Sequence, residues 1–514
     1  MRTEYYVVDS KSPDEPSMQA AAEVIRRGGL VAFPTETVYG LGADGLNEDA
    51  VAKIFQAKGR PADNPLILHI AATEELEALV KSVPPKAKTL MERFWPGPLT
   101  LVLPRTDLVP DAVTGGLDTV AVRMPDSIVA RRLIELAGVP LAAPSANVSG
   151  RPSPTDAQAV AADLDGRVDV ILDAGACRIG LESTVVDCSA ETPILLRPGG
   201  ITREMLAEAV GTVNIDPAIG AAVAVPRSPG MKYTHYAPAA PMRLVEETGL
   251  AGQTLLRTEI RRELTAGRRV GAVVCREMAA ELPDGVVAAV YGSRLRLREI
   301  AAGLYSALRY FDEHPVDIIY AEGVDEAGLG LAVMNRLRKA AGHDLVRRKF
   351  RVLFVCTGNT CRSPMAAALL NQQICQSGWE GRIEASSAGL AAGRGPASAG
   401  AFHAMAERGI DLQSHRARPL TDTAVGEADL ILTMTAGHQR EIGRYWPPAA
   451  EKTFTVTEFA VETGDVADPF AGDTAVYRLC AGQLLHCQDK FWPRLTQLAG
   501  KKGLTPNLKQ DNGR

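Results

Sequence analysis

Cys356 and Arg362 place a nucleophilic thiol and a guanidinium in one short string, CTGNTCR, with five residues between them. The apolar run VLFV precedes them, and a helix is expected to follow, with Ser363 as its N-cap and Pro364 as its first residue. Backbone N–H groups of the loop would point inward, and Arg362 would hold two phosphate oxygens as a planar fork. The pattern predicts an anion cradle that keeps Cys356 as a thiolate nucleophile. A Cys-x5-Arg match on its own favours the alternative, a buried structural cysteine in a turn.

Asp468, in the string DPF, is the candidate acid for this cradle. An Asp before a Pro is also a common turn initiator, so only the pairing with Cys356 makes Asp468 a candidate acid. With these residues in place, the chain resembles the low-molecular-weight protein phosphatase family over about residues 350–498. Further landmarks of that family match SSAGL from Ser386, DLQSHRARPL from Asp411 and ADLILTMTAGHQREI from Ala428.

The resemblance implies a two-step phosphoryl transfer from phosphorylated protein substrates. Cys356 would attack phosphorus, and Arg362 and the loop amides would stabilise the equatorial oxygens. Asp468 would protonate the leaving group and then activate water. Asn359 and Ser363 match family positions that hold the loop and the thiolate.

Thr360 bears on the substrate class. Tyrosine-specific members usually carry an aliphatic residue there and aromatic walls, whereas this chain has Thr360 and the acid loop DPFAGD. A hydroxyl supplies hydrogen bonding at the cost of apolar packing, so the resemblance favours a protein-arginine phosphatase, with a tyrosine phosphatase as the alternative. An arsenate reductase of this fold would need further redox cysteines, and ADLILTMTAGHQ has none. Cys361 is expected either to form a reversible disulfide with Cys356 or to be a packed spectator thiol.

The N-terminal segment 28–70 concentrates polar groups in the string GGLVAFPTETVYGLGADGLNEDAVAKIFQAKGRPADNPLILHI. Lys58 and Arg60 flank a glycine, so two cations can converge while the backbone stays close to an anion such as a triphosphate. A KGR triplet on its own is more typical of a solvated surface turn. In PSANVSG, Ser145 and Asn147 share one face of an extended segment, which suits either ligand recognition or a capped turn.

Ordered motifs extend this pattern along the chain: PTETVYGLG, KGRPADNPL, WPGPLT, TVAVRMPD, APSANVSG, ESTVVD and LRPGGIT. They resemble the YrdC/Sua5 family of threonylcarbamoyl-adenylate synthases over about residues 5–210. The connector SPGMKYTHYAP and the later AEGVDEAGLGLAVMNRLRKAA are similar to the longer Sua5 branch, which adds a C-terminal domain. By this resemblance, L-threonine, bicarbonate or CO2, and ATP condense to threonylcarbamoyl-AMP and pyrophosphate. A partner transferase complex then moves the threonylcarbamoyl group to a tRNA adenosine beside the anticodon.

The same resemblance implies two sets of binding residues. Arg123 is the natural partner for the amino-acid carboxylate, because a bidentate fork fits that group. The implied threonine-binding residues are Thr35, His69, Arg123 and Ser183. The implied ATP-binding residues are Lys58, Arg60, Asn64, Thr119, Ala143, Ser145, Asn147, Ser153, Arg197 and Tyr236, the last reaching back from the connector as part of a lid.

None of these motifs offers a strong general base for carbamate formation. A lone histidine such as His69 is more often a hydrogen-bonded structural residue, so His69 is assigned to binding only. We therefore expect catalysis by positioning threonine, carbonate and the α-phosphate, with Mg²⁺ on the phosphates of ATP. No tightly bound cofactor and no protein metal site are expected.

The elements that must position these residues are helices interleaved with short apolar strands, as in MQAAAEVIRRGG followed by LVAFP. The predicted class is an α/β multidomain protein with a YrdC-like domain, a Sua5-type domain and a parallel-sheet phosphatase domain. The accessory Sua5-type domain has no catalytic constellation and is expected to regulate or to support the lid. The predicted boundaries are 1–210 for the synthase domain, 211–240 for a linker or lid, 241–347 for the accessory domain, 348–500 for the phosphatase domain and 501–514 for a frayed tail.

Composition narrows the remaining function classes. A formal net charge of −5 supplies no global basic field for nucleic acid. An N-terminal RNA-binding module is the alternative to a synthase, but it would need more dispersed Lys and Arg and more stacking aromatics than the 5% present. The eight cysteines include no CxxC pair, the N-terminus lacks a secretory pattern, and no apolar run is long enough for a membrane span. These observations predict a cytoplasmic protein that has no membrane partner.

Overall fold

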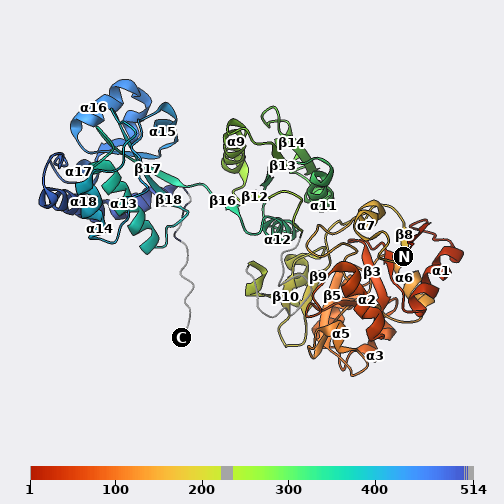
Figure 1. Cartoon of the computed structure of the whole chain (residues 1–514). Helices are drawn as coiled ribbons and strands as arrows, with labels where there is room; N and C mark the ends of the chain where they lie inside the picture. Colours follow the sequence, from red (N-terminus) through yellow and green to blue (C-terminus); the bar gives the residue numbers. More distant parts are fainter. Residues whose placement is uncertain (1, 221–235, 503, 505, 507–514) are drawn as a thin grey trace. The chain divides into compact units, whose positions relative to one another are not determined.

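The computed structural model of this chain describes residues 2–220, 236–502, 504 and 506. It divides into two units, Met1–Val346 and Arg347–Arg514, and each is described here by itself. The first unit contains two sheets and the second contains one, all with helices packed on them (Figure 1). The predicted α/β class is confirmed. Half of the predicted lid (211–240) and most of the predicted tail (501–514) lie outside the described residues.

The first sheet is mixed and has the order β1-β8-β2-β3-β7-β4-β6-β5-β9-β10-β11. Its strands are β1 (Glu4–Val7), β2 (Val31–Phe33), β3 (Gly40–Asp44), β4 (Ile67–His69), β5 (Leu99–Pro104), β6 (Thr119–Arg123), β7 (Leu141–Ala142), β8 (Val170–Asp173), β9 (Thr184–Asp187), β10 (Ile194–Arg197) and β11 (Asn214–Ile215). Its helices are α1 (Glu15–Arg26), α2 (Glu48–Lys58), α3 (Leu76–Leu79), α4 (Pro85–Phe94), α5 (Asp111–Thr114), α6 (Ile128–Ala137), α7 (Ala157–Leu164) and α8 (Arg203–Val210), with short 3-10 turns η1 (Thr73–Glu75) and η2 (Pro217–Gly220).

Helix α1 shows why these residues form these elements. The side chain of Asp14 caps the helix by accepting the N–H of Ser17. Met18, Ala22 and Ile25 recur at helical spacing and are fully buried. Together with α6 they cover one face of the sheet, and β2, buried along its whole length, follows the turn after α1.

The second sheet is parallel throughout, with the order β14-β13-β15-β12-β16. Its strands are β12 (Met242–Val245), β13 (Val270–Cys275), β14 (Val287–Gly292), β15 (Ile318–Glu322) and β16 (Leu345–Val346), and its helices are α9 (Gly249–Thr265), α10 (Arg276–Ala279), α11 (Leu297–Glu313) and α12 (Gly330–Ala340). Helix α11 buries Leu304, Leu308 and Phe311 in the core of this sheet. Tyr305 and Arg309 of α11 and Arg336 of α12 form hydrogen bonds with the first sheet's domain.

The second unit holds a parallel sheet in the order β18-β17-β19-β20. Its strands are β17 (Phe350–Cys356), β18 (Ile383–Gly389), β19 (Leu430–Thr433) and β20 (Thr453–Thr455). Its helices are α13 (Arg362–Gln376), α14 (Ala399–Ala406), α15 (Asp422–Glu427), α16 (Ala436–Tyr445), α17 (Val456–Phe459) and α18 (Thr474–Lys501), with the 3-10 turn η3 (Pro447–Lys452).

Alternating side chains of β17 enter two separate cores, as the period of a strand requires. Val352 and Phe354 pack in the core that contains residues of α13 and α18. Leu353 and Val355 pack in the core that contains residues of α15 and α16. Both faces of the sheet are therefore covered, and Cys356 emerges at the carboxyl end of its buried strand. Among the described residues, no helix is long and apolar enough to cross a membrane.

Candidate functional site

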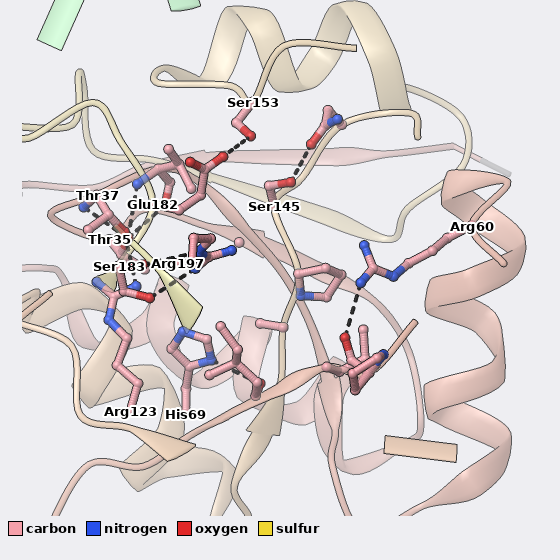
Figure 2. A pocket seen from close by; sticks show the side chains of 18 of the residues that line it. Thr35, Thr37, Arg60, His69, Arg123, Ser145, Ser153, Glu182, Ser183 and Arg197 are labelled. Atoms are coloured by element: carbon pink, nitrogen blue, oxygen red, sulfur yellow. Dashed lines mark hydrogen bonds between the residues drawn. The ribbon is translucent and has the colours of Figure 1, made fainter. Parts of the chain in front are cut away.

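A pocket opens in the first unit where several strands of the first sheet end (Figure 2). His69 ends β4 and Arg123 ends β6, and these parallel strands place the two residues side by side in register. Ser183 precedes β9, and Arg197 ends β10. The sequence-predicted residues that line the pocket are Thr35, Arg60, His69, Arg123, Ala143, Ser145, Asn147, Ser153, Ser183, Arg197 and Tyr236.

The predicted threonine-binding residues all line this pocket, and Arg123 is linked to Thr35 through Thr37. Its Nη1 donates to Thr37 Oγ1 at 3.0 Å, and that oxygen lies 2.7 Å from Thr35 Oγ1. Its Nη2 lies 2.7 Å from Glu36 Oε1, and both side chains of this ion pair are buried. Arg123 thus already faces one carboxylate of the protein, which sets its orientation toward the pocket.

His69 is held as a neutral ring. Burial, and then the positive charge of Arg123, lower the pKa of His69 to about 3. Its Nδ1 lies 3.2 Å from the Ile67 carbonyl. A neutral, buried imidazole is suited to hydrogen bonding, and its low pKa makes it a poor general base near neutral pH.

Three of the predicted ATP-binding residues do not line the pocket. Lys58 is fully buried, and its Nζ donates to the carbonyls of Ser145 and Asn147, so it holds the PSAN loop from behind. Burial, and then Arg60, lower the pKa of this amine well below its usual value. Thr119 begins β6, and four residues of strand, about 13 Å, separate it from Arg123.

Asn64 is the third of these residues and is buried. Its Oδ1 has no hydrogen-bond partner within the part of the chain that the structure describes. Its carbonyl accepts from Arg60, whose Nη2 also donates to the Pro65 carbonyl at 3.0 Å. Asn64 therefore orients Arg60 through the backbone.

Ser145 and Asn147 lie on one side of the pocket, and their side chains meet. The Ser145 hydroxyl donates to Asn147 Oδ1 at 2.5 Å, while the Asn147 amide donates to the Arg151 carbonyl at 2.9 Å. Figure 2 shows Ser145 to the right of Ser183 and Arg197 among the side chains that line the pocket. The loop presents polar groups in a fixed arrangement, which favours ligand recognition over a surface turn.

Glu182 lines the pocket and was not anticipated from the sequence. It accepts from the Ser153 hydroxyl at 2.6 Å, from the Tyr305 hydroxyl at 2.8 and 2.7 Å, and from Arg336. Burial alone would raise the pKa of Glu182, but Arg336 and then Arg197 hold it at about 2. Sequence reasoning looked for cations and neutral polar groups that bind anions. An acidic residue such as Glu182 was therefore not selected.

The second candidate site is the loop between β17 and α13. The Cys356 thiol lies 3.0 Å from Ser363 Oγ and accepts the N–H of Asn359 at 3.2 Å. The Asn359 amide donates to Ser363 Oγ at 2.9 Å. Arg362 Nη2 donates to Asp468 Oδ2 at 2.6 Å, so the predicted cradle and the predicted acid are brought together.

The start of α13 differs from the sequence prediction. The helix begins at Arg362 with Cys361 as its N-cap, and Ser363 and Pro364 lie within the first turn. Ser363 does not cap the helix because its hydroxyl faces the Cys356 thiol and the Asn359 amide.

The last two residues of the loop, Thr360 and Cys361, lie beside the predicted cradle. The Cys361 thiol is packed against Ser398 Oγ at 3.2 Å and Tyr477 OH at 3.4 Å. Thr360 has its hydroxyl 3.6 Å from that thiol and is partly exposed beside the cradle. Cys356 and Cys361 are both free thiols.

Histidines that the sequence reasoning did not single out support the loop. His438 Nε2 lies 2.9 Å from Thr357 Oγ1, and burial and then Arg362 lower its pKa. His415 Nε2 lies 2.8 Å from the Asn359 carbonyl. Both lie in strings that carry the family resemblance, but only the folded chain shows which of their residues touch the loop. Among the described residues, no group of three or more His, Cys, Asp or Glu could hold a metal ion.

Comparisons with family models divide the chain into three matched regions. The Sua5/YciO/YrdC model, described as "Telomere recombination", matches residues 23–199. The model described as "Threonylcarbamoyl-AMP synthase, C-terminal domain" matches residues 201–342. The model described as "Low molecular weight phosphotyrosine protein phosphatase" matches residues 351–501.

Individual proteins match the same regions. A threonylcarbamoyl-AMP synthase of Bacillus subtilis is 52% identical over 346 residues, which cover 66% of this chain and 97% of that protein. The crystal structure of Sua5 from P. abyssi complexed with L-threonine is 50% identical, covers 67% of this chain and 100% of that one, and has a TM-score of 0.64. An arginine phosphatase from Geobacillus stearothermophilus (39% identical, 30% of this chain and 96% of that one) and a low-molecular-weight protein tyrosine phosphatase from T. tengcongensis (41%, 28% and 99%) each have a TM-score of 0.27.

Proposed function

Because the chain belongs to the threonylcarbamoyl-AMP synthase family and carries a low-molecular-weight phosphatase domain, we propose that it joins two specific reactions in one polypeptide. The first condenses L-threonine, bicarbonate or CO2, and ATP to threonylcarbamoyl-AMP and pyrophosphate, for transfer to tRNA by a partner complex. The second hydrolyses phosphorylated proteins, with phosphoarginine as the preferred substrate. We assign the synthase to 1–210 with its lid at 211–240, the accessory domain to 241–347, the phosphatase to 348–500 and the tail to 501–514.

The observation that carries the synthase proposal is the gathering of the predicted threonine residues at one pocket. Arg123 pairs with the threonine carboxylate, Thr35 and Ser183 offer hydroxyls, and neutral His69 offers a ring nitrogen. The P. abyssi relative was solved with L-threonine, which supports a threonine subsite in this chain.

ATP occupies the rest of the same pocket in this proposal. Arg60 and Arg197 face the phosphates, and the PSAN loop presents Ser145 and Asn147. Ala143 and Ser153 complete the proposed set in the pocket, with Tyr236 over the nucleotide. Lys58 acts by holding the loop, Asn64 acts through Arg60, and Thr119 lies outside the pocket lining. Glu182 is already engaged by side chains of the protein, so the ligands of Mg²⁺ would come chiefly from the ATP phosphates.

The reaction then proceeds by positioning. The threonine amine adds to CO2, or to bicarbonate with loss of one water, and gives up a proton, so that the carbamate forms. A carbamate oxygen then attacks the α-phosphate, its bond to phosphorus forms as the bond to pyrophosphate breaks, and pyrophosphate leaves. The arginines offset charge on the phosphates, and enclosure of the pocket keeps water from the mixed anhydride.

The Lys58→Ala variant tests the synthase site. Without Nζ, the carbonyls of Ser145 and Asn147 lose their common donor and the loop no longer holds its shape, so threonine-dependent conversion of ATP to pyrophosphate should fall at least about 100-fold. The Lys58→Met variant keeps the volume and should behave like Lys58→Ala. Near-normal turnover in either variant would overturn the assignment.

Thermal stabilisation of the wild-type chain by RNA, without stabilisation by ATP plus threonine, would favour an RNA-binding module.

In the proposed phosphatase reaction, Cys356 attacks phosphorus and forms a cysteinyl phosphate as the bond to the leaving nitrogen breaks. Asp468 gives its proton to that nitrogen and then takes one from the water that releases phosphate. Support comes from Arg362, which contacts Asp468 at 2.6 Å at the mouth of the loop. Since all eight cysteines are free and the nucleophile must stay reduced, a cytoplasmic location suits this chemistry.

Peptides containing phosphoarginine or phosphotyrosine test the substrate class, with Cys356→Ser as the blank. We expect faster hydrolysis of phosphoarginine, because the Thr360 hydroxyl beside the cradle can hydrogen-bond a guanidinium. In Thr360→Ile the ratio of the two rates should shift at least about tenfold toward phosphotyrosine. Preferred phosphotyrosine hydrolysis by the wild type would place this domain with the tyrosine phosphatases and leave the synthase proposal intact.

A further inference from the structure

Glu182 joins the synthase pocket to the second sheet's domain. Its side chain is buried, and its oxygens accept hydrogen bonds from residues of two domains. Ser153 of the pocket donates at 2.6 Å. From the accessory domain, Tyr305 of α11 donates at 2.7 Å, and Arg336 of α12 donates from Nε and Nη2 at 3.0 Å each.

Arg336 is among the most deeply buried side chains described, with an exposed fraction of 0%. The guanidinium reaches Glu182 with Nε and Nη2, and its Nη1 donates to the carbonyl of Pro198. Pro198 follows Arg197, so a single side chain of the accessory domain holds two points of the pocket wall. Burying an arginine so completely is costly unless its partners are fixed, which makes this contact a defined geometric constraint.

The two points that Arg336 holds lie next to residues that face the ligand. Ser183 follows Glu182, and its carbonyl accepts from Nε and Nη2 of Arg197 at 3.1 Å each. Ser153 is tied to the other side of Glu182. A shift of Glu182 would therefore move Ser153, Ser183 and Arg197 together.

Charge gives Arg336 a second effect. ATP, threonine and bicarbonate all bring negative charge to a pocket in which Glu182 is already negative. Arg197 lies within electrostatic reach of Glu182, and without Arg336 the two would be left to pair with each other. The positive charge of Arg336 thus offsets the negative charge of Glu182 from the accessory-domain side of the pocket.

Tyr305 contacts both Glu182 and the residue proposed to cover the nucleotide, Tyr236. Its hydroxyl binds Glu182, and its ring centroid lies 5.2 Å from that of Tyr236. Tyr236 lines the pocket, so the accessory domain touches both the wall and the residue proposed to cover the nucleotide.

We propose that Arg336 and Tyr305 are positioning residues of the synthase, which act through Glu182 to shape the ATP side of the pocket. The accessory domain is then part of the synthase pocket. This inference rests on the proposed assignment of ATP to this pocket.

The test measures KM and kcat for threonine-dependent pyrophosphate release by the full chain, with phosphatase rate and melting temperature recorded for each variant. Arg336→Gln should raise the KM for ATP by about tenfold, since Glu182 loses the cation that hydrogen-bonds it and pairs with Arg197 instead. Arg336→Lys, which keeps the charge, should recover part of the loss. Arg338→Gln is the matched control, because Arg338 lies two residues along α12 and pairs with Glu246 and Glu326 inside the accessory domain. It should keep the wild-type KM.

A double variant separates positioning from general destabilisation. If Arg336 acts through Glu182, then Glu182→Gln/Arg336→Gln should bind ATP no more weakly than Arg336→Gln alone, since the uncompensated charge is gone. The inference would be overturned if the KM increases of the two single variants multiplied in the double variant. A wild-type KM in Arg336→Gln would also overturn it. Should Arg336→Gln fail to fold, Tyr305→Phe removes one hydroxyl only, and an unchanged KM for ATP there would equally overturn it. Wild-type protein without threonine-dependent turnover would instead contradict the proposed function.

Discussion

At the scale of single residues, burial decides what the charged groups of the pocket can do. His69 and Lys58 lose charge stabilisation through burial, whereas Glu182 keeps its charge because Arg336 and Arg197 offset it. The pocket therefore presents fixed arginines and neutral hydrogen-bonding groups. That combination supports catalysis by positioning better than catalysis by a general base.

The pH dependence of stability should reveal the buried neutral His69. Its pKa in the folded chain is about 3, below the usual value of 6.5, so the unfolded chain binds more protons between these values. Its contribution to stability is present above about pH 6.5 and is lost as the pH falls toward 3, by about 1.4 kcal/mol per pH unit. Denaturant unfolding of the wild type and of His69→Asn, from about pH 7 to about pH 5, should show a difference in stability that is nearly constant at the upper end and shrinks toward that rate below about pH 6.5. A difference that stays constant throughout would mean that His69 binds a proton as readily in the folded chain as in the unfolded chain.

At the scale of elements, the cradle loop shows both the reach and the limits of sequence reasoning. The strand, loop and helix from Phe350 were predicted because an apolar run and a helix start have local signatures, and β17 and α13 confirm them. The predicted N-cap at Ser363 was wrong because its hydroxyl has partners in the loop. Lys58 was expected to face the ligand, and its orientation depends on carbonyls 87 and 89 residues away, which local patterns do not encode.

Asn359 is the residue on which the loop's shape depends. Its φ is 54°, in the left-handed region, and its amide donates to Ser363 Oγ and Ser387 Oγ at 2.9 Å each. Asn359→Ala should lower the phosphatase kcat by about 10- to 100-fold, because Ser363 Oγ, which lies beside the Cys356 thiol, loses the amide that holds it in place. Asn359→Gly removes the same amide but accepts this φ, so it should lose as much activity while melting at a higher temperature than Asn359→Ala. A wild-type kcat in either variant would show that the amide is dispensable.

At the scale of the whole molecule, the two sites differ in what they need from the rest of the chain. The cores of the phosphatase unit contain residues from Phe350 to Leu504 alone. The synthase pocket, in contrast, takes Tyr305 and Arg336 from a second sheet. The boundary between the units lies at Val346 and Arg347. The contacts of Tyr305 and Arg336 with the pocket therefore lie within the first unit, and the phosphatase cores lie within the second.

Cutting the chain at two places should therefore have opposite results. Fragments 1–346 and 347–514 should each keep their reaction at a kcat/KM within about threefold of the intact chain, because neither loses a core or a contact of its site. A fragment 1–210 keeps nearly every described residue that lines the pocket but loses Tyr236, Tyr305 and Arg336, so Glu182 loses its accessory-domain partners. Its threonine-dependent pyrophosphate release should fall at least about 100-fold, since Glu182 without Arg336 both repels ATP and no longer fixes the pocket wall. Full activity in fragment 1–210 would mean that the first sheet forms a complete synthase and that the second sheet serves another purpose.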